Sequence, residues 1–105
     1  MFARIMDSLT QLGFRAYLCA IRRGKVDFTQ PTEKRLKRQK LAIFDEVEEL
    51  VAAKREASPH IPAYTADAEE AADVIISALT YLALTGVDID GLIEEKMKYN
   101  ETRER

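Results

Sequence analysis

The sequence predicts an all-α fold in which four helices pack as a bundle. Apolar residues recur every three or four positions through most of the chain, and no run alternates apolar with polar residues as a strand would. Segments that contain Pro or Gly interrupt this pattern and divide it into four. At 105 residues, the chain is expected to form a single domain, residues 1–105, with short connections between its helices.

The first two helices are separated by the segment GKVDFTQPT, residues 24–32. The first helix is expected over residues 2–23, where the apolar side chains follow helical spacing. Thr32 suits the N-cap of a second helix, which is expected to reach about Ala57. Two prolines in SPHIPAYT, residues 58–65, then break the helical pattern.

The last two helices have well-marked ends. Thr65 is the expected N-cap of the third helix, which stops at Gly86 because glycine readily adopts the left-handed conformation found there. Asp88 is the expected N-cap of a fourth helix that runs to about Arg103. Because a domain this small has only a modest core, we expect assembly into a homodimer or homotetramer to complete it.

The composition is typical of a folded soluble domain. The single Cys19 cannot form an internal disulfide, which favours a reducing compartment, and its apolar neighbours favour a packing role. No apolar run approaches the roughly 20 residues of a membrane-spanning helix, and the first residues lack the form of a signal peptide. We therefore expect a cytoplasmic protein with no membrane partner.

The two parts of the chain carry opposite charge. Residues 1–40 contain ten Lys or Arg and three acidic residues, whereas residues 41–105 contain six and fifteen. Such an asymmetry can attract an anionic ligand to one end of a protein while the other end holds cations. The cations of KRLKRQK, residues 34–40, spread around a helix instead of forming a stripe, so nucleic acid is not the expected partner.

Acidic residues three positions apart occur on the second and third helices. Glu46 and Glu49 lie at the edge of the apolar arc of the second helix, whereas its other acidic residues point outward. On the third helix, Glu70 and Asp73 share a flank, and Asp73 comes directly before a stretch without charge. A solvated helix surface is the simplest explanation of one such pair. Two pairs from packed helices could instead hold a hard cation such as Mg²⁺, which prefers carboxylate and water oxygens.

The order and spacing of these pairs resemble the signature of the MazG-like all-α nucleoside triphosphate pyrophosphohydrolases. That signature is Glu-x-x-Glu, a spacer of about a dozen to about thirty residues, and Glu-x-x-Asp. Here EVEE covers residues 46–49, twenty residues follow, and EAAD covers residues 70–73. The segment GVDIDGLIEEKMKYNETR, residues 86–103, resembles the closing part of the family, and the whole resemblance extends over residues 36–103.

The resemblance implies Mg²⁺-dependent cleavage between the α and β phosphates of a nucleoside triphosphate, which gives the monophosphate and pyrophosphate. It implies that the four carboxylates of the two pairs are the catalytic metal ligands, with Mn²⁺ as the alternative ion. It also implies substrate contacts from Lys96, Asn100 and Arg103, which follow a Lys-x-x-x-Asn-x-x-Arg pattern.

Two other functions remain open from the sequence. Phosphoribosyl-ATP pyrophosphohydrolase belongs to the same superfamily, so the reaction would be the same and the substrate would differ. A non-catalytic helical module could keep the acidic residues for metal-assisted stability or for binding a partner. Several aromatic side chains could stack on a nucleotide base, and the sequence does not choose among Phe14, Tyr17, Phe28, Tyr64 and Tyr81.

Overall fold

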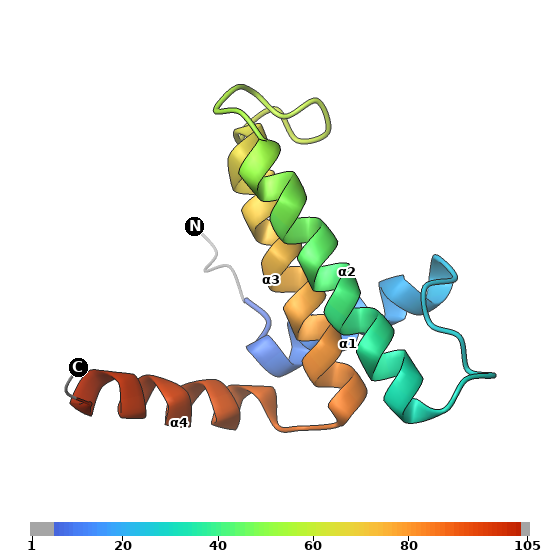
Figure 1. Cartoon of the computed structure of the whole chain (residues 1–105). Helices are drawn as coiled ribbons and strands as arrows, with labels where there is room; N and C mark the ends of the chain where they lie inside the picture. The colour runs from blue at the N-terminus through green and yellow to red at the C-terminus, as the bar shows by residue number, and fades with distance from the viewer. Residues whose placement is uncertain (1–5, 104–105) are drawn as a thin grey trace.

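The computed structural model describes residues 6–103, which form four helices and no strand (Figure 1). The helices are α1 (Leu9–Arg22), α2 (Thr32–Ala52), α3 (Ala66–Thr85) and α4 (Ile89–Thr102). An isolated bridge between Ala57 and Thr65 is the only extended pairing within this range. The prediction of an all-α chain with four helices is therefore confirmed.

The helices do not form a closed bundle within one chain. In Figure 1, α2 and α3 run antiparallel side by side, and α1 packs on α3. The chain bends by 114° between α3 and α4, so α4 projects away from the other helices. Within the described residues, α4 contacts α1 and α3 but not α2.

The first helix begins at Leu9, later than the residue 2 expected from periodicity. Ser8 is its N-cap, and a capping box joins Ser8 to Gln11 through reciprocal hydrogen bonds. The free N–H groups of Leu9 and Thr10 donate to the Asp90 carboxylate of α4, at 3.0 and 3.2 Å. These bonds fix the helix start and attach α4 to it. Residues 1–5 of the expected helix lie outside the described range.

The second helix ends at Ala52, five residues earlier than expected. The following segment has hydrogen-bond partners at the beginning of α3 instead of within a helix. The carbonyl of Glu56 accepts from the N–H of Ala66 at 2.7 Å. At the other end, Thr32 is the first helical residue and not the cap, since Pro31 holds the N-cap position without a side-chain bond.

The caps of the last two helices are as predicted. The Thr65 hydroxyl accepts from the N–H of Ala68 at the start of α3. Gly86 ends α3 in the left-handed conformation with φ of 76°, which a side chain would strain. The Asp88 carboxylate accepts from the N–H of Gly91 at 3.2 Å, and α4 ends at Thr102 with Arg103 as its C-cap.

The core is thin and lies where α1, α3 and the start of α4 meet. Ile89 is its most enclosed large side chain, at 1% exposure. Gly13 makes this possible, because a Cβ at that position would lie 2.5 Å from Ile89 Cδ1. The only other buried apolar residues in the described chain are Ala16, Ala20 and Leu79. The start of α4 is thus part of the core, whereas the rest of α4 is outside it.

Hydropathy was also compared with the needs of a membrane span. Between residues 6 and 103, no single helix is long and apolar enough to cross a membrane. The bent pair α3 and α4 satisfies the length and composition requirements only when both helices are taken together.

Candidate metal centre

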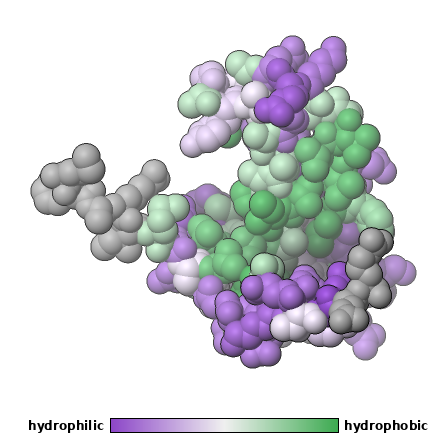
Figure 2. Space-filling view, turned by 90° about the vertical axis from the view of Figure 1, so that its left-hand side faces the viewer, coloured by the Kyte–Doolittle hydropathy of each residue, from purple (hydrophilic) through white to green (hydrophobic). Residues whose placement is uncertain are grey.

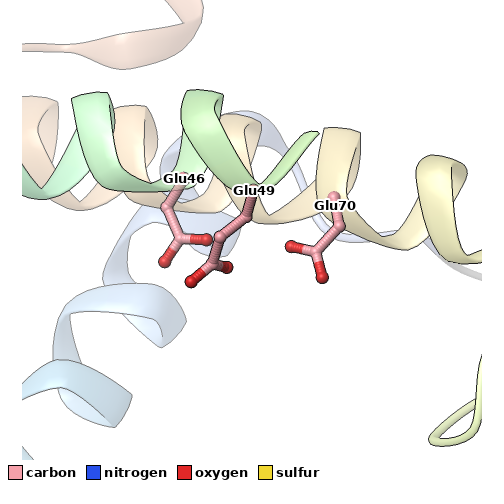
Figure 3. Close-up of side chains that lie close together, drawn as sticks. All are labelled: Glu46, Glu49 and Glu70. Atoms are coloured by element: carbon pink, nitrogen blue, oxygen red, sulfur yellow. The ribbon is translucent and has the colours of Figure 1, made fainter. Parts of the chain in front are cut away.

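Three glutamates from two helices meet on one side of the α2–α3 pair (Figure 3). Glu46 and Glu49 are three residues apart on α2, so they project to neighbouring positions on the same flank. Glu70 comes from the start of α3, which runs antiparallel beside the end of α2. One carboxylate oxygen from each lies within 4.8 Å of the others. The structure therefore brings together three of the four carboxylates that the sequence singled out.

The fourth carboxylate, Asp73, lies about one helical turn after Glu70. It is not within the 4.8 Å set. It lines a pocket between α1, α2 and α3 together with Glu46. The cluster and this pocket are therefore adjacent, and Glu46 belongs to both.

The carboxylates disfavour each other's ionisation. Burial, and then the charges of Glu49 and Asp73, raise the pKa of Glu46. Burial, and then Glu49 and Asp73, raise the pKa of Glu70 in the same way. The pKa of Asp73 is also raised, by burial and then by the charges of Glu69 and Glu49. A cation bound at this cluster would relieve the repulsion and release the protons that it favours.

The donor set fits a hard divalent cation. Every candidate ligand is a carboxylate oxygen, and no Cys or His joins the cluster. The Oε2 atom of Glu70 is buried and has no hydrogen-bond partner, which is unusual for a carboxylate oxygen. Glu46, Glu49 and Glu70 could hold an ion such as Mg²⁺ or Mn²⁺, with water or a ligand completing its coordination.

The pocket beside the cluster measures about 100 Å³. Small side chains leave this space, namely Ala16 and Ala20 of α1 and Ala42 of α2. One wall is polar because the Gln39 amide donates to both the carbonyl and the hydroxyl of Ser77, at 2.9 and 3.0 Å. This pair ties α2 to α3 next to the acidic residues.

Two cations that the sequence analysis did not select also line this pocket, Arg23 and Lys25. Arg23 is the C-cap of α1, and Gly24 follows in the left-handed conformation with φ of 71°. The N–H of Lys25 then donates to the Ala20 carbonyl at 2.9 Å. The helix end thus folds both residues back toward α1. The sequence RRGK, in which a glycine follows basic residues, is the local signal for this arrangement.

The cations and the acidic residues share the pocket without pairing. The charge of Arg23 counteracts the rise in the pKa of Asp73, and Lys25 does the same for Glu46. Among the described residues, however, neither Arg23 nor Lys25 forms an ion pair within 4.0 Å. The pocket therefore offers separate positive and negative groups, which suits a ligand that combines a metal ion with an anion.

The predicted substrate contacts on α4 are placed elsewhere within one chain. Lys96, Asn100 and Arg103 are exposed, and α4 does not touch α2. Lys96 and Arg103 both lie over the ring of Tyr99, at 4.6 and 5.7 Å from its centroid. The structure does not bring these three residues together with the glutamate cluster, and their contact with a substrate stays a prediction.

The single cysteine and the aromatic residues also differ from simple expectation. Cys19 is exposed and lines the pocket, so the expected packing role in the core is wrong. None of the five aromatic residues considered for base stacking lines this pocket. Two of them are engaged by cations, because Arg35 lies over Phe28 and Lys40 over Tyr81, at 5.3 and 5.8 Å.

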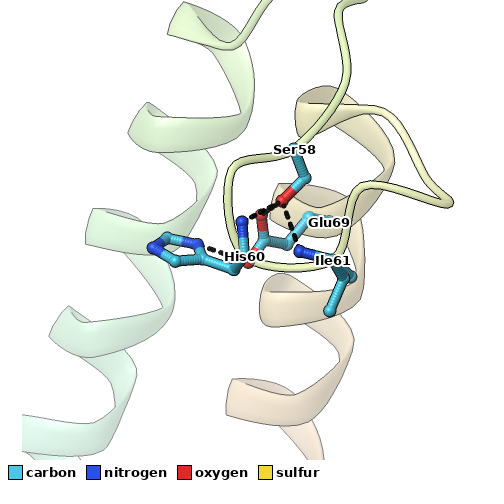
Figure 4. A network of polar contacts seen from close by, with 4 residues as sticks. All are labelled: Ser58, His60, Ile61 and Glu69. Atoms are coloured by element: carbon cyan, nitrogen blue, oxygen red, sulfur yellow. Dashed lines mark hydrogen bonds and ion pairs between the residues drawn. The ribbon is translucent and has the colours of Figure 1, made fainter.

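Glu69 holds a loop and does not join the glutamate cluster (Figure 4). Its carboxylate accepts from the hydroxyl of Ser58 at 2.5 Å and lies 3.0 Å from Nδ1 of His60. The same hydroxyl accepts from the N–H groups of His60 and Ile61. Mainly because of the Ser58 bond, the pKa of Glu69 is lowered. His60 is thus a loop residue with a structural partner.

Replacing Ser58 with Ala should lower the free energy of unfolding by about 1–3 kcal/mol, because Ser58 is 1% exposed and its loss leaves buried donors and an acceptor without a partner. Chemical denaturation at pH 7 measures this. The exposed partner provides the comparison, since His60→Ala should change stability by less than about 0.5 kcal/mol. Because the pKa of Glu69 is lowered in the folded state, its contribution is present above the ordinary carboxyl pKa and is lost as pH falls through the lowered value. Equal effects of the two substitutions would contradict this assignment.

Comparisons with protein-family models, with curated proteins and with solved structures found no match to this chain.

Proposed function

We propose that this chain is a Mg²⁺-dependent nucleoside triphosphate pyrophosphohydrolase that cleaves between the α and β phosphates. One observation carries the proposal: carboxylates of α2 and α3 converge beside a pocket that also contains two cations without ion-pair partners. A nucleotide with its metal ion presents the matching charges, since the metal requires oxygen ligands and the phosphates attract cations. The order of the acidic motifs in the sequence supports the same function.

The acidic residues and the cations have separate roles in the proposed reaction. Glu46, Glu49 and Glu70 hold the metal, and Asp73 extends the acidic surface into the pocket. Mg²⁺, when bound, neutralises phosphate charge and orients water for attack. A carboxylate that is free of the metal accepts the proton of that water as its oxygen bonds to phosphorus. The bond from phosphorus to the bridging oxygen then breaks.

Arg23 and Lys25 are the proposed contacts for the leaving pyrophosphate. Negative charge develops on the leaving group as the bridging bond breaks, and nearby cations stabilise it. These two residues line the same pocket as Glu46 and Asp73, whereas Lys96 and Arg103 lie on the projecting α4. Within one chain, Arg23 and Lys25 are therefore better placed for this role than the cations of α4.

A nucleotide panel tests the function directly. The purified chain is incubated with ribo-, deoxy- and modified nucleoside triphosphates and with phosphoribosyl-ATP, in Mg²⁺, in Mn²⁺ and in EDTA. We expect at least one compound to yield equal amounts of monophosphate and pyrophosphate with metal and none with EDTA. Turnover of phosphoribosyl-ATP alone would keep the reaction and change the substrate. Release of orthophosphate would contradict the cleavage position, and inactivity throughout would favour a non-catalytic module.

A further inference from the structure

The described fold is too open for a stable monomer of this size. A folded monomer of 11.9 kDa is expected to expose about 6,000 Å², whereas this chain exposes 8522 Å². Its radius of gyration is 15.7 Å, compared with about 13 Å for a compact domain of 105 residues. The surplus surface is about 2,500 Å².

The terminal residues do not account for this surplus. Seven residues, 1–5 and 104–105, lie outside the described range. A fully extended chain exposes about 1.45 Å² per dalton, so seven residues contribute at most about 1,200 Å². At least about 1,300 Å² of the surplus therefore belongs to the described helices, and a standard interface buries only about 800 Å² per partner.

A large share of the exposed apolar surface lies between α1 and α3. A groove of about 380 Å³ is lined by apolar residues of both helices, with Arg15 as the only charged residue along it. Ile75 and Ile76 are 59% and 48% exposed there. A second hollow of about 290 Å³, with Glu69 as its only charged residue, adjoins the groove at Ala72. We call the two together the α1–α3 strip; its main apolar members are Leu12, Ala16, Cys19, Ile61, Tyr64, Ala68, Ala72, Ile75, Ile76 and Leu79.

Figure 2 shows this kind of surface from the side toward which α4 points. Hydrophobic side chains form a broad area on the upright part of the molecule, between polar surfaces at the top and at the bottom of the view. Exposed apolar areas of this extent, bordered by polar residues, mark interaction sites. The strip is therefore a surface that association would cover.

We propose that a second copy of this chain packs on the α1–α3 strip. Obligate homodimer interfaces resemble a domain core and are more apolar than other interfaces, which matches the composition of the strip. A twofold axis places the same patch of both copies face to face. The two charged residues, Arg15 and Glu69, are opposite in sign and lie in different hollows of the strip, so an antiparallel pairing brings no like charges together. The surplus area is sufficient for such an interface.

The molecular mass in solution tests this proposal. Analytical ultracentrifugation of the intact chain should give at least twice 11.9 kDa, and Ile75→Glu should reduce the mass to that of one chain because it places a charge inside the apolar contact. Val51→Glu is the matched control, because Val51 is 81% exposed on α2 and lies outside the strip. This control should keep the mass of the unmodified protein. Dissociation by Val51→Glu alone would place the contact on α2 and overturn the proposal.

Cys19 provides a second measurement on the unmodified protein, which does not depend on whether Ile75→Glu folds. It is the only cysteine of the chain, and it lines the groove and is exposed in one copy. In the assembled protein, a thiol reagent should modify it at least about ten-fold more slowly than in denaturant, since the second copy covers the groove. Equal rates would overturn the proposal. A protein of monomer mass would overturn it as well, whether or not Cys19 is protected. These readouts contain no nucleotide, so they are independent of the proposed catalytic function.

Discussion

Replacing Glu49 with Gln should lower the rate of Mg²⁺-dependent pyrophosphate release at least about 100-fold, because it removes a charged ligand from the centre of the glutamate cluster. Glu48→Gln is the matched control. It changes the adjacent residue of the same helix by the same chemistry, but Glu48 is exposed and lies outside the cluster. Its rate should stay within about two-fold of the unmodified protein. Equal losses in both variants would show that the cluster is not the metal site.

Stability without metal provides an independent test of the cluster. The raised pKa values of Glu46, Glu70 and Asp73 mean that these acids bind protons more readily in the folded than in the unfolded chain. The metal-free protein therefore loses stability as pH rises through the interval above the ordinary carboxyl pKa.

Asp73→Asn removes one of the repelling charges, so in EDTA at pH 7 its melting temperature should be equal to or higher than that of the unmodified protein. Its turnover with Mg²⁺ should be abolished. Differential scanning calorimetry with and without Mg²⁺ measures the first effect, and the nucleotide assay measures the second. A large drop in melting temperature would identify Asp73 as a structural residue.

Replacing Arg23 or Lys25 with Gln should lower kcat/KM for the nucleotide about 10- to 100-fold, because each removes a charge from the pocket beside the glutamate cluster. Lys37→Gln is the control, since Lys37 is an exposed cation of α2 that lines neither this pocket nor its neighbours. It should leave kcat/KM unchanged within about two-fold.

The same series can include Lys96→Gln to compare the pocket with α4. If Arg23 and Lys25 contact the phosphates, their loss should outweigh the loss of Lys96. A larger effect of Lys96→Gln would show that α4 supplies the phosphate contact after all. Binding of pyrophosphate with Mg²⁺, measured by calorimetry, separates a loss of affinity from a loss of chemistry.

Local signals predicted the fold wherever neighbouring residues decide the structure. The caps at Thr65, Gly86 and Asp88 each act within one helical turn, and each was correct. Ser8 and Gln11 form an equally local capping box, but the apolar periodicity on both sides of it hid the true start of α1. The end of α2 could not be predicted in this way, because the Glu56 carbonyl bonds to a residue of the next helix.

The candidate site divides along the same line. Spacing along a helix placed Glu46 beside Glu49, and an antiparallel neighbour was enough to bring Glu70 to them. The position of Asp73 relative to this set depends on how α2 and α3 are rotated against each other, which periodicity does not give. Arg23 and Lys25 reach the pocket only because α1 packs on α3 and its end folds back. Tertiary contacts of this kind have no signature in the sequence.

The attachment of α4 has a mechanical consequence. Its first residues are fixed, since Ile89 fills the space over Gly13 and Asp90 accepts from the first N–H groups of α1. The fourteen residues of α4 extend about 21 Å from this base. A change of about 30° in the direction of the helix would therefore displace its last turn by about 10 Å. A substitution at Gly13, remote from Asn100 in the sequence, would change where Asn100 lies through this single support.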